Sequence, residues 1–151
     1  AAWIGGLAVE DPAEPMAGGW DSRERVVRDL AHPLYEAAGI GPDDIDLVQL
    51  NDAFSVAEPL YLEALGFAAP GDGIALQRDG RTAPTGDVPT NTDGGLIGRG
   101  HCLGATGVAM LYETWLQMGG RAGPRQLERT PRTALIQSHG YGGENLFVLE
   151  A

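Results

Sequence analysis

The chain has 151 residues, a length that favours one domain large enough to bury a core of its own. Hydrophobic residues make up 43% and charged residues 21%, and no apolar run reaches the roughly 18 residues that a membrane helix needs. The formal net charge is -11 and all ten basic side chains are arginine, which argues against a nucleic-acid surface and excludes a Schiff-base lysine.

The first part of the chain alternates between strand-like and helical patterns. Residues 2–9 form a short apolar run that predicts a strand, and the Pro- and Gly-rich segment after it predicts a loop. Apolar residues at helical spacing predict a helix over residues 21–38, which Pro33 is expected to kink or divide. Residues 45–50 then alternate as a strand that runs directly into Asn51 and a second helix. Such a strand-to-helix junction is where α/β proteins often place function.

The second part is rich in glycine and turns. Residues 66–93 are mostly turn residues, too many for a simple connector, so they predict a binding loop or a partner-contacting loop. A glycine-dense loop over residues 94–107 leads into a helix with one apolar face, made of Val108, Leu111, Trp115 and Met118. Two strands, 133–137 and 145–150, flank a glycine turn near the end. This order predicts an α/β fold of three layers, a mixed β-sheet with helices on both sides.

His101 is the residue we consider most strongly as catalytic. It lies in the glycine-dense loop just before a helix, where the positive end of the helix dipole disfavours imidazolium. A neutral imidazole can accept a proton or donate a hydrogen bond to a forming oxyanion, and the glycines let the backbone approach a ligand. From the residues alone, a packed histidine or a phosphate cradle without the P-loop lysine stays open as well. Asn51 by itself is equally readable as an ordinary turn or capping residue.

Three blocks of the sequence resemble the thiolase superfamily. GHCLGATG over residues 100–107 resembles the GHPxGATG block, NDAF over 51–54 resembles NEAF or HDCF, and the closing strand-glycine-strand segment resembles the family's C-terminal end. The GIGPDDID and QSHGYGG segments favour the sterol-carrier-protein-like branch, which includes lipid-transfer proteins and acetyl-CoA acetyltransferases. The resemblance covers residues 1–151 and implies a thiolase-like C-terminal domain whose N-terminal half is absent from this chain. The opening without methionine points the same way.

The resemblance implies roles for two of these residues. His101 matches the family histidine that activates the nucleophilic cysteine and helps form an oxyanion hole for the thioester carbonyl. Asn51 matches the asparagine that holds a water in the same hole. The nucleophilic cysteine belongs to the N-terminal half in this family. Cys102 stands where the family has proline, and we expect it to be a small buried thiol rather than a partner of His101.

A second cysteine of the family has no counterpart in this chain. Its two usual positions fall at Ala53 and near Ser138, and a serine hydroxyl is far too weak an acid to replace a thiol. His139 and Tyr141 lie on the same turn and are candidates for a substitute acid or base, with Glu144 able to orient one of them. Otherwise Ser138, His139 and Tyr141 are turn residues without a special role.

For the complete protein the resemblance implies acyl transfer on an acyl-CoA, with the coenzyme A thioester as substrate, no permanently bound cofactor and no metal. The chain alone is expected to be inactive, and the complete protein to be cytoplasmic and homo-oligomeric. The acidic charge predicts that the coenzyme's phosphates are held mainly elsewhere, and Arg78, Arg81 and Arg99 either contact an acyl or phosphate group or pair with carboxylates. Two alternatives stay open: a noncatalytic thiolase-fold scaffold or lipid-binding subunit, and an aldolase-like enzyme acting on acyl-CoA.

Overall fold

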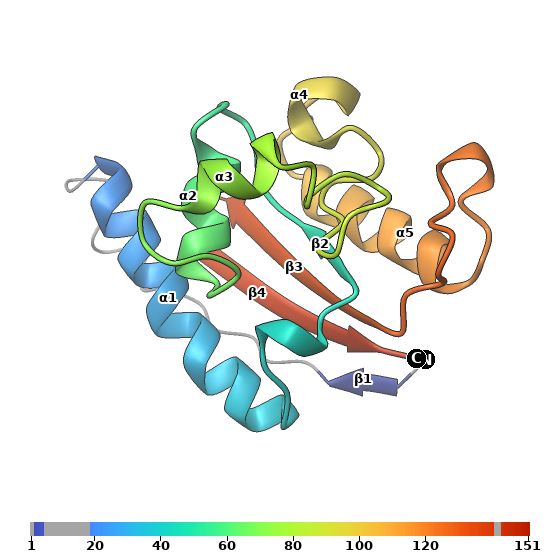
Figure 1. Ribbon diagram of the computed structural model, residues 1–151, viewed down its shortest axis with the longest axis horizontal. Helices are drawn as coiled ribbons and strands as arrows, with labels where there is room; N and C mark the ends of the chain where they lie inside the picture. The colour runs from blue at the N-terminus through green and yellow to red at the C-terminus, as the bar shows by residue number, and fades with distance from the viewer. Residues whose placement is uncertain (1, 5–18, 141–142) are drawn as a thin grey trace.

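The computed structural model describes residues 2–4, 19–140 and 143–151, and it places a sheet between two layers of helices (Figure 1). This three-layer α/β arrangement with a mixed sheet confirms the fold class expected from the sequence. The elements follow in chain order as β1 (Ala2–Ile4), α1 (Gly19–Ala38), η1 (Pro42–Asp44), β2 (Leu47–Gln49), α2 (Ala57–Ala64), α3 (Gly73–Arg78), α4 (Gly95–Arg99), α5 (Thr106–Met118), η2 (Gly123–Arg125), β3 (Thr133–Gly140) and β4 (Gly143–Glu150).

The sheet has the strand order β1-β4-β3-β2. Strand β2 is parallel to β3, with Val48 opposite Leu135, whereas β4 is antiparallel to both β3 and β1. The segment after α3 covers the outer edge of β2, because the Val48 N–H donates to the Pro89 carbonyl and the Asn91 N–H donates to the Val48 carbonyl, both at 2.9 Å. Since β2 and β3 run in the same direction, their carboxyl ends meet at one end of the sheet.

Each face of the sheet packs against its own helices. On one face, alternate residues of β3 and β4 lie under α1 and α2 and form the larger core, with Leu135, Leu146 and Val148 packed against Val27 and Leu62. On the other face, Ile136 and Leu149 pack against Met110 of α5. The period-2 alternation of the two strands therefore sends their side chains into two separate cores.

Several local expectations change. Helix α1 begins at Gly19 and runs through Pro33 to Ala38 as one element, so the proline does not divide it. The segment over residues 66–93 contains α3 and packs into the core through Leu76 and Val88, instead of forming an open loop. The expected strand over residues 2–9 is described only as β1, and its remainder lies outside the described residues. None of the described helices is both long and apolar enough to span a membrane.

Helix α5 divides its expected apolar face, because Leu111 and Met118 pack against the core while Val108 and Trp115 are exposed to solvent. Val108, Tyr112 and Trp115 are 67%, 59% and 48% exposed, and the Tyr112 and Trp115 rings stack with their centroids 5.8 Å apart. The face turned to the protein interior is largely polar and consists of Thr106, Met110, Glu113, Thr114 and Gln117. Gln117 is held by a buried network in which it bonds to Glu113, to Thr92 and to the Arg125 carbonyl, whereas the buried Thr114 hydroxyl has no hydrogen-bond partner among the described residues. An exposed apolar patch such as the outer face is typical of surfaces that contact another protein or domain.

Candidate functional site

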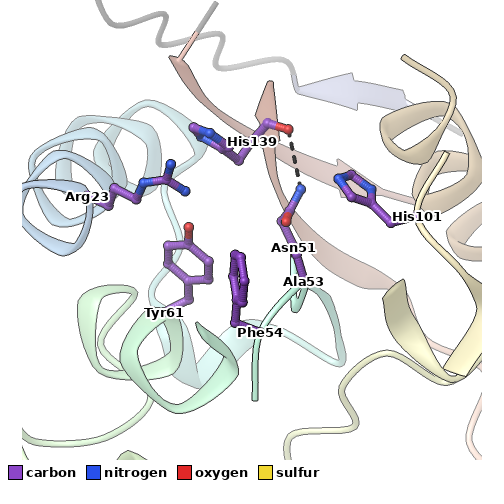
Figure 2. Close-up of a pocket in the computed structure, with 7 residues that line it drawn as sticks. All are labelled: Arg23, Asn51, Ala53, Phe54, Tyr61, His101 and His139. Carbon is purple, nitrogen blue, oxygen red and sulfur yellow. Dashed lines mark hydrogen bonds between the residues drawn. The ribbon is translucent and has the colours of Figure 1, made fainter. Parts of the chain in front are cut away.

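A pocket of about 190 Å³ lies at the end of the sheet where β2 and β3 both terminate (Figure 2). Its walls come from α1, the segment after β2, α2, the loop before α5, and β3. The lining residues are Arg23, Asn51, Ala53, Phe54, Tyr61, His101 and His139. The fold thus brings together three residues singled out from the sequence, Asn51, His101 and His139, which lie far apart along the chain.

Asn51 lies two residues after the end of β2 and is 6% exposed. Its backbone N–H donates to Gln137 Oε1 at 2.9 Å, and its side-chain Nδ2 donates to the His139 carbonyl at 3.3 Å, the bond dashed in Figure 2. Both bonds tie the residue to β3 and fix the orientation of the amide. Because Nδ2 is directed at a backbone carbonyl, Oδ1 is the acceptor that Asn51 can offer to a water or to a ligand donor.

His101 is held by a hydroxyl from the first turn of α5. Its Nδ1 lies 2.9 Å from Thr106 Oγ1, and the same hydroxyl donates to the Cys102 carbonyl at 3.1 Å. A hydroxyl has one hydrogen, and this one is already given to Cys102, so Thr106 accepts a hydrogen bond from the Nδ1–H of His101. A neutral imidazole bonded in this way has its proton on Nδ1 and its lone pair on Nε2, the arrangement that a general base needs.

Cys102 departs from the expectation of a buried thiol, because its side chain is exposed and does not line the pocket. The loop before α5 leaves it outside the packed layers. The residue after His101 therefore contributes its backbone carbonyl, as the acceptor of the Thr106 hydroxyl, and the thiol takes no part in the described contacts of the pocket.

His139 is supported by a carboxylate on the neighbouring strand. It pairs directly with Glu144 across β3 and β4, and its Nδ1 lies 3.0 Å from Glu144 Oε1. Glu144 is 1% exposed, and its other oxygen accepts a hydrogen bond of 2.6 Å from Gln137 Nε2. Residues paired across antiparallel strands share a face of the sheet, so the alternation that makes Leu135 and Leu146 core residues also brings this ion pair to the pocket.

Tyr61 and Arg23 complete the wall opposite His101 (Figure 2). The Tyr61 hydroxyl donates to Glu144 Oε1 at 3.5 Å and is hydrogen-bonded to the Arg23 guanidinium. Burial raises the pKa of the Tyr61 phenol, the Glu144 carboxylate raises it further, and Arg23 partly offsets this. Tyr61 is therefore a neutral hydrogen-bond donor throughout the physiological pH range.

The other residues singled out from the sequence take different places. Ser138 alternates to the opposite face of β3, where its Oγ would lie 3.1 Å from a Cβ added at Gly107 of α5, and it does not line the pocket. Tyr141 lies outside the described residues. Glu144 lies beside the histidine of this segment, with Oε1 3.0 Å from His139 Nδ1.

The three arginines near the glycine-dense loop all pair with carboxylates. Arg81 makes a bidentate contact with Asp87, and Arg99 pairs with Asp93. Arg78 lies 3.6 Å from Asp79. Of the two functions expected for these residues, the structure favours ion pairing. Among the described residues there is also no group of three His, Cys, Asp or Glu side chains placed to hold a metal ion.

Arg23, Tyr61 and Thr106 were not identified from the sequence. A signal for Arg23 exists, since it lies four residues before Val27 and eight before Ala31 and so extends the buried stripe of α1. Tyr61 likewise occupies the buried face of α2 and is 1% exposed. A polar group on an apolar helical face indicates a partner or a site, although the pattern does not say which.

Comparison with known proteins agrees with the resemblance. Residues 21–149 match the family described as thiolase C-terminal domain-like. The chain is 38% identical over 117 residues to benzoylsuccinyl-CoA thiolase subunit BbsB of Thauera aromatica, covering 78% of this chain and 30% of that protein. It is 41% identical over 122 residues to sterol carrier protein 2 of Rattus norvegicus, covering 81% of this chain and 22% of that protein.

A solved structure described as an Ltp2-ChsH2(DUF35) aldolase shares the fold with a TM-score of 0.74 and 26% sequence identity, covering 83% of this chain and 31% of that one. The chain belongs to the thiolase C-terminal domain-like family, within the sterol-carrier-protein-like branch of the thiolase superfamily. It spans less than a third of the length of the relatives described, with shares of 30%, 22% and 31%.

Proposed function

We propose that this chain is the C-terminal half of a thiolase-like acyl-CoA acyltransferase, of the acetyl-CoA acetyltransferase or lipid-transfer type. In this proposal the chain supplies a histidine base and an oxyanion hole and is inactive without an N-terminal half. The observation that carries it is the convergence of His101, with its lone pair on Nε2, and Asn51, with its amide fixed by β3, on one pocket. The coenzyme A thioester is the substrate, and the pocket receives its acyl end.

The two residues divide the chemistry of a thioester. Nε2 of His101 takes the proton of the nucleophile that the N-terminal half provides. The nucleophile then attacks the thioester carbonyl carbon, and the C=O electron pair moves onto oxygen. The new imidazolium Nε2–H and a water held by Asn51 Oδ1 stabilise that oxyanion, a contribution of about 3 to 4 kcal/mol for one such donor. When the tetrahedral adduct collapses, coenzyme A leaves as the thiol with the proton from His101.

The N-terminal half is the main partner in this proposal. The relatives are about three to four and a half times as long as the matched segment, because the matched shares are 30%, 22% and 31%. We assign the exposed face of α5, made of Val108, Tyr112 and Trp115, as the surface that this half covers. The same half holds most of the coenzyme's negative charge, because this chain has a net charge of -11 and Arg78, Arg81 and Arg99 are paired.

A second reaction of the same site is favoured by one observation. The pocket is lined by Ala53 at one of the positions where the family carries a second cysteine, and none of its lining residues is a thiol. The fold also matches a structure described as an aldolase. An aldolase-like cleavage of an acyl-CoA uses His101 and Asn51 in the same places but needs no thiol nucleophile. We place either reaction in the cytoplasm of the cell and in a homo-oligomer of the complete protein.

The experiment is a comparison of acyl-CoA turnover by the complete protein with and without His101. Coenzyme A release from acetyl-CoA and longer acyl-CoA esters is followed with a thiol reagent, and aldehyde or ketone release reports the aldolase reaction. His101→Ala is expected to lower turnover by about 100-fold or more, whereas His32→Ala on the exposed face of α1 is expected to have no effect. Equal turnover by the His101→Ala variant would show that the site does not act as proposed.

A further inference from the structure

We propose that His139 is the second proton carrier of this pocket and that Glu144 is its positioning residue. The inference rests on the proposed function and adds to it the group that moves a proton at the carbon next to the thioester. The imidazoles of His101 and His139 both line the pocket, but they come from different elements and have different partners. His101 has a neutral hydroxyl at Nδ1, whereas His139 has a buried carboxylate there.

The carboxylate of Glu144 is fixed from three sides. It is 1% exposed, accepts a 2.6 Å hydrogen bond from Gln137, accepts the Tyr61 hydroxyl at 3.5 Å, and lies 3.0 Å from His139 Nδ1. A charge with so little access to water is costly unless it is paired and hydrogen-bonded. Neither Gln137 nor Tyr61 neutralises it, since both are uncharged. His139 lies 3.0 Å from Glu144 and can carry a compensating positive charge, and the Arg23 guanidinium, hydrogen-bonded to Tyr61, adds positive charge to the same wall of the pocket.

This arrangement gives the two nitrogens of His139 different surroundings. Nδ1 lies 3.0 Å from the Glu144 carboxylate, outside hydrogen-bond geometry, and the attraction of that carboxylate favours a proton on Nδ1. We therefore assign Nε2 as the nitrogen that exchanges a proton with a ligand, as in other carboxylate-histidine pairs. The charged and titratable groups that face the ring are Glu144 from β4, Arg23 from α1 and the imidazole of His101, and the neutral phenol of Tyr61 completes the set.

The position of His139 suits this role better than the adjacent residue does. Side chains alternate along β3, so Ser138 faces α5 while His139 faces the pocket. Asn51 lies next to His139, because its Nδ2 donates a hydrogen bond to the carbonyl of His139. A ligand whose thioester oxygen lies at Asn51 therefore has its neighbouring carbon within the pocket that His139 lines.

The step balances without an oxidant or a reductant. In the bond-forming direction, neutral Nε2 of His139 takes a proton from the α-carbon of an acyl-CoA, and the C–H electron pair becomes the enolate that forms the new carbon-carbon bond. In the cleaving direction, the carbon-carbon bond breaks with its electron pair on the α-carbon, and the imidazolium of His139 returns a proton to that carbon. The same half-reaction serves both the acyl transfer and the aldolase-like reaction.

The test is the exchange of α-protons of acetyl-CoA for deuterium by the complete protein in heavy water, followed by NMR of the methyl group. His139→Gln is expected to lower the exchange rate by about 100-fold or more. The matched control is His32→Gln, because His32 also lies beside a glutamate, Glu36, at 3.6 Å, but on an exposed part of α1 where no change is expected. Glu144→Gln is expected to lower the rate by about 10-fold or more, as the loss of an orienting partner does.

A second measurement follows the tautomer of the His139 ring instead of a reaction rate. The ¹⁵N shifts of the His139 ring in the neutral protein are expected to show the Nδ1–H tautomer, and Glu144→Gln is expected to shift the ring toward the Nε2–H tautomer. An Nε2–H tautomer in the unaltered protein, or full exchange by folded His139→Gln, overturns the inference and leaves the function proposed for His101 intact. If the unaltered protein neither exchanges these protons nor turns over any acyl-CoA, the proposed function fails and this inference fails with it.

Discussion

The hydroxyl of Thr106 lies 2.9 Å from Nδ1 of His101 and 3.1 Å from the Cys102 carbonyl to which it donates. In the function proposed above, this relationship decides which ring nitrogen of His101 is the base. The loop before α5 and the first turn of that helix thus form one unit, in which the helix residue bonds the ring of the loop residue. Thr106 is 5% exposed, whereas His101 itself is exposed.

Removal of the Thr106 hydroxyl is the direct test of that relationship. Thr106→Val keeps the shape of the side chain but cannot accept from Nδ1, and we expect acyl-CoA turnover by the complete protein to fall by about 10- to 100-fold. Thr106→Ser retains the hydroxyl and is expected to keep most of the turnover. The ¹⁵N shifts of the His101 ring provide the independent readout, since they change in the Val variant and not in the Ser variant. Equal activity of the two variants would contradict the assigned tautomer.

The turn before α4 depends on one glycine. Gly95 has φ +60, and a Cβ at this position would lie 2.2 Å from a carboxylate oxygen of Asp52, which accepts the Leu96 N–H at 2.7 Å. Gly95→Ala is expected to cost about 1 to 2 kcal/mol from the left-handed backbone alone, with the contact adding to it. Gly98→Ala is the matched control in the same helix, because nothing lies within 4 Å of an added Cβ there.

Urea unfolding of the chain measures both glycine variants. We expect Gly95→Ala to lower the free energy of unfolding, and Gly98→Ala to leave it unchanged or raise it by up to about 1 kcal/mol. A stable Gly95→Ala variant would mean that Asp52 and the N-terminus of α4 separate without cost.

The exposed face of α5 is expected to matter only in the complete protein. Val108 is 67% exposed, so Val108→Asp should leave the melting temperature of this chain unchanged. In the complete protein the same aspartate is buried against the N-terminal half, and we expect the melting temperature to fall by several degrees. The control is Ile74→Asp on α3, where the residue is 64% exposed. It should leave the melting temperatures of this chain and of the complete protein unchanged. A complete protein indifferent to Val108→Asp would show that its N-terminal half covers another surface.

The acid stability of the chain should depend on Glu113. Burial raises the pKa of this carboxyl, but Arg125, Gln117 and Thr92 lower it by more, so the pKa lies below its ordinary value. A lowered pKa means that the ionised form stabilises the fold above the unfolded pKa of about 4.3, and that this stabilisation is lost as pH falls through the folded value. Glu113→Gln should therefore destabilise at pH 7, by about 1 to 3 kcal/mol, and the difference should shrink below pH 4.

Urea unfolding between pH 7 and pH 3 measures this dependence. The control is Glu36→Gln, since Glu36 is 71% exposed in a pair with His32 and should show little dependence on pH. If the difference in free energy of unfolding between the wild type and Glu113→Gln stays constant from pH 7 to pH 3, the stabilising network assigned to Glu113 is contradicted.

The glycine-dense loop and the three-layer fold could be predicted because their signals are local. GHCLGATG carries both His101 and Thr106, and the alternation of residues 45–50 leads directly to Asn51. The walls of the pocket could not be predicted in the same way. Tyr61 and Glu144 come together because β4 returns antiparallel to β3 beneath α2, a long-range pairing that no local pattern encodes.

Helix α5 shows a second limit of sequence patterns. Its apolar residues mark a face for burial, but the pattern does not say whether the sheet or another domain buries it. Here Glu113 and Gln117 face inward because Thr92, Arg125 and the turn around Leu127 satisfy them, which leaves Val108 and Trp115 outside. The partners of the inward face come from distant segments, so the polar interior could not be deduced from the helix itself.

The central claim is that His101 and Asn51 act together on one thioester oxygen, and a double-mutant cycle in the complete protein tests it most directly. His101→Ala and Asn51→Ala should each lower acyl-CoA turnover by about 100-fold or more, while Asn145→Ala, which removes a similar bond to a β3 carbonyl at 3.4 Å, should not. The double variant should lose far less than the product of the two single losses, because both act on the same charge. Losses that multiply in full, or a single variant with unchanged turnover, would contradict the account.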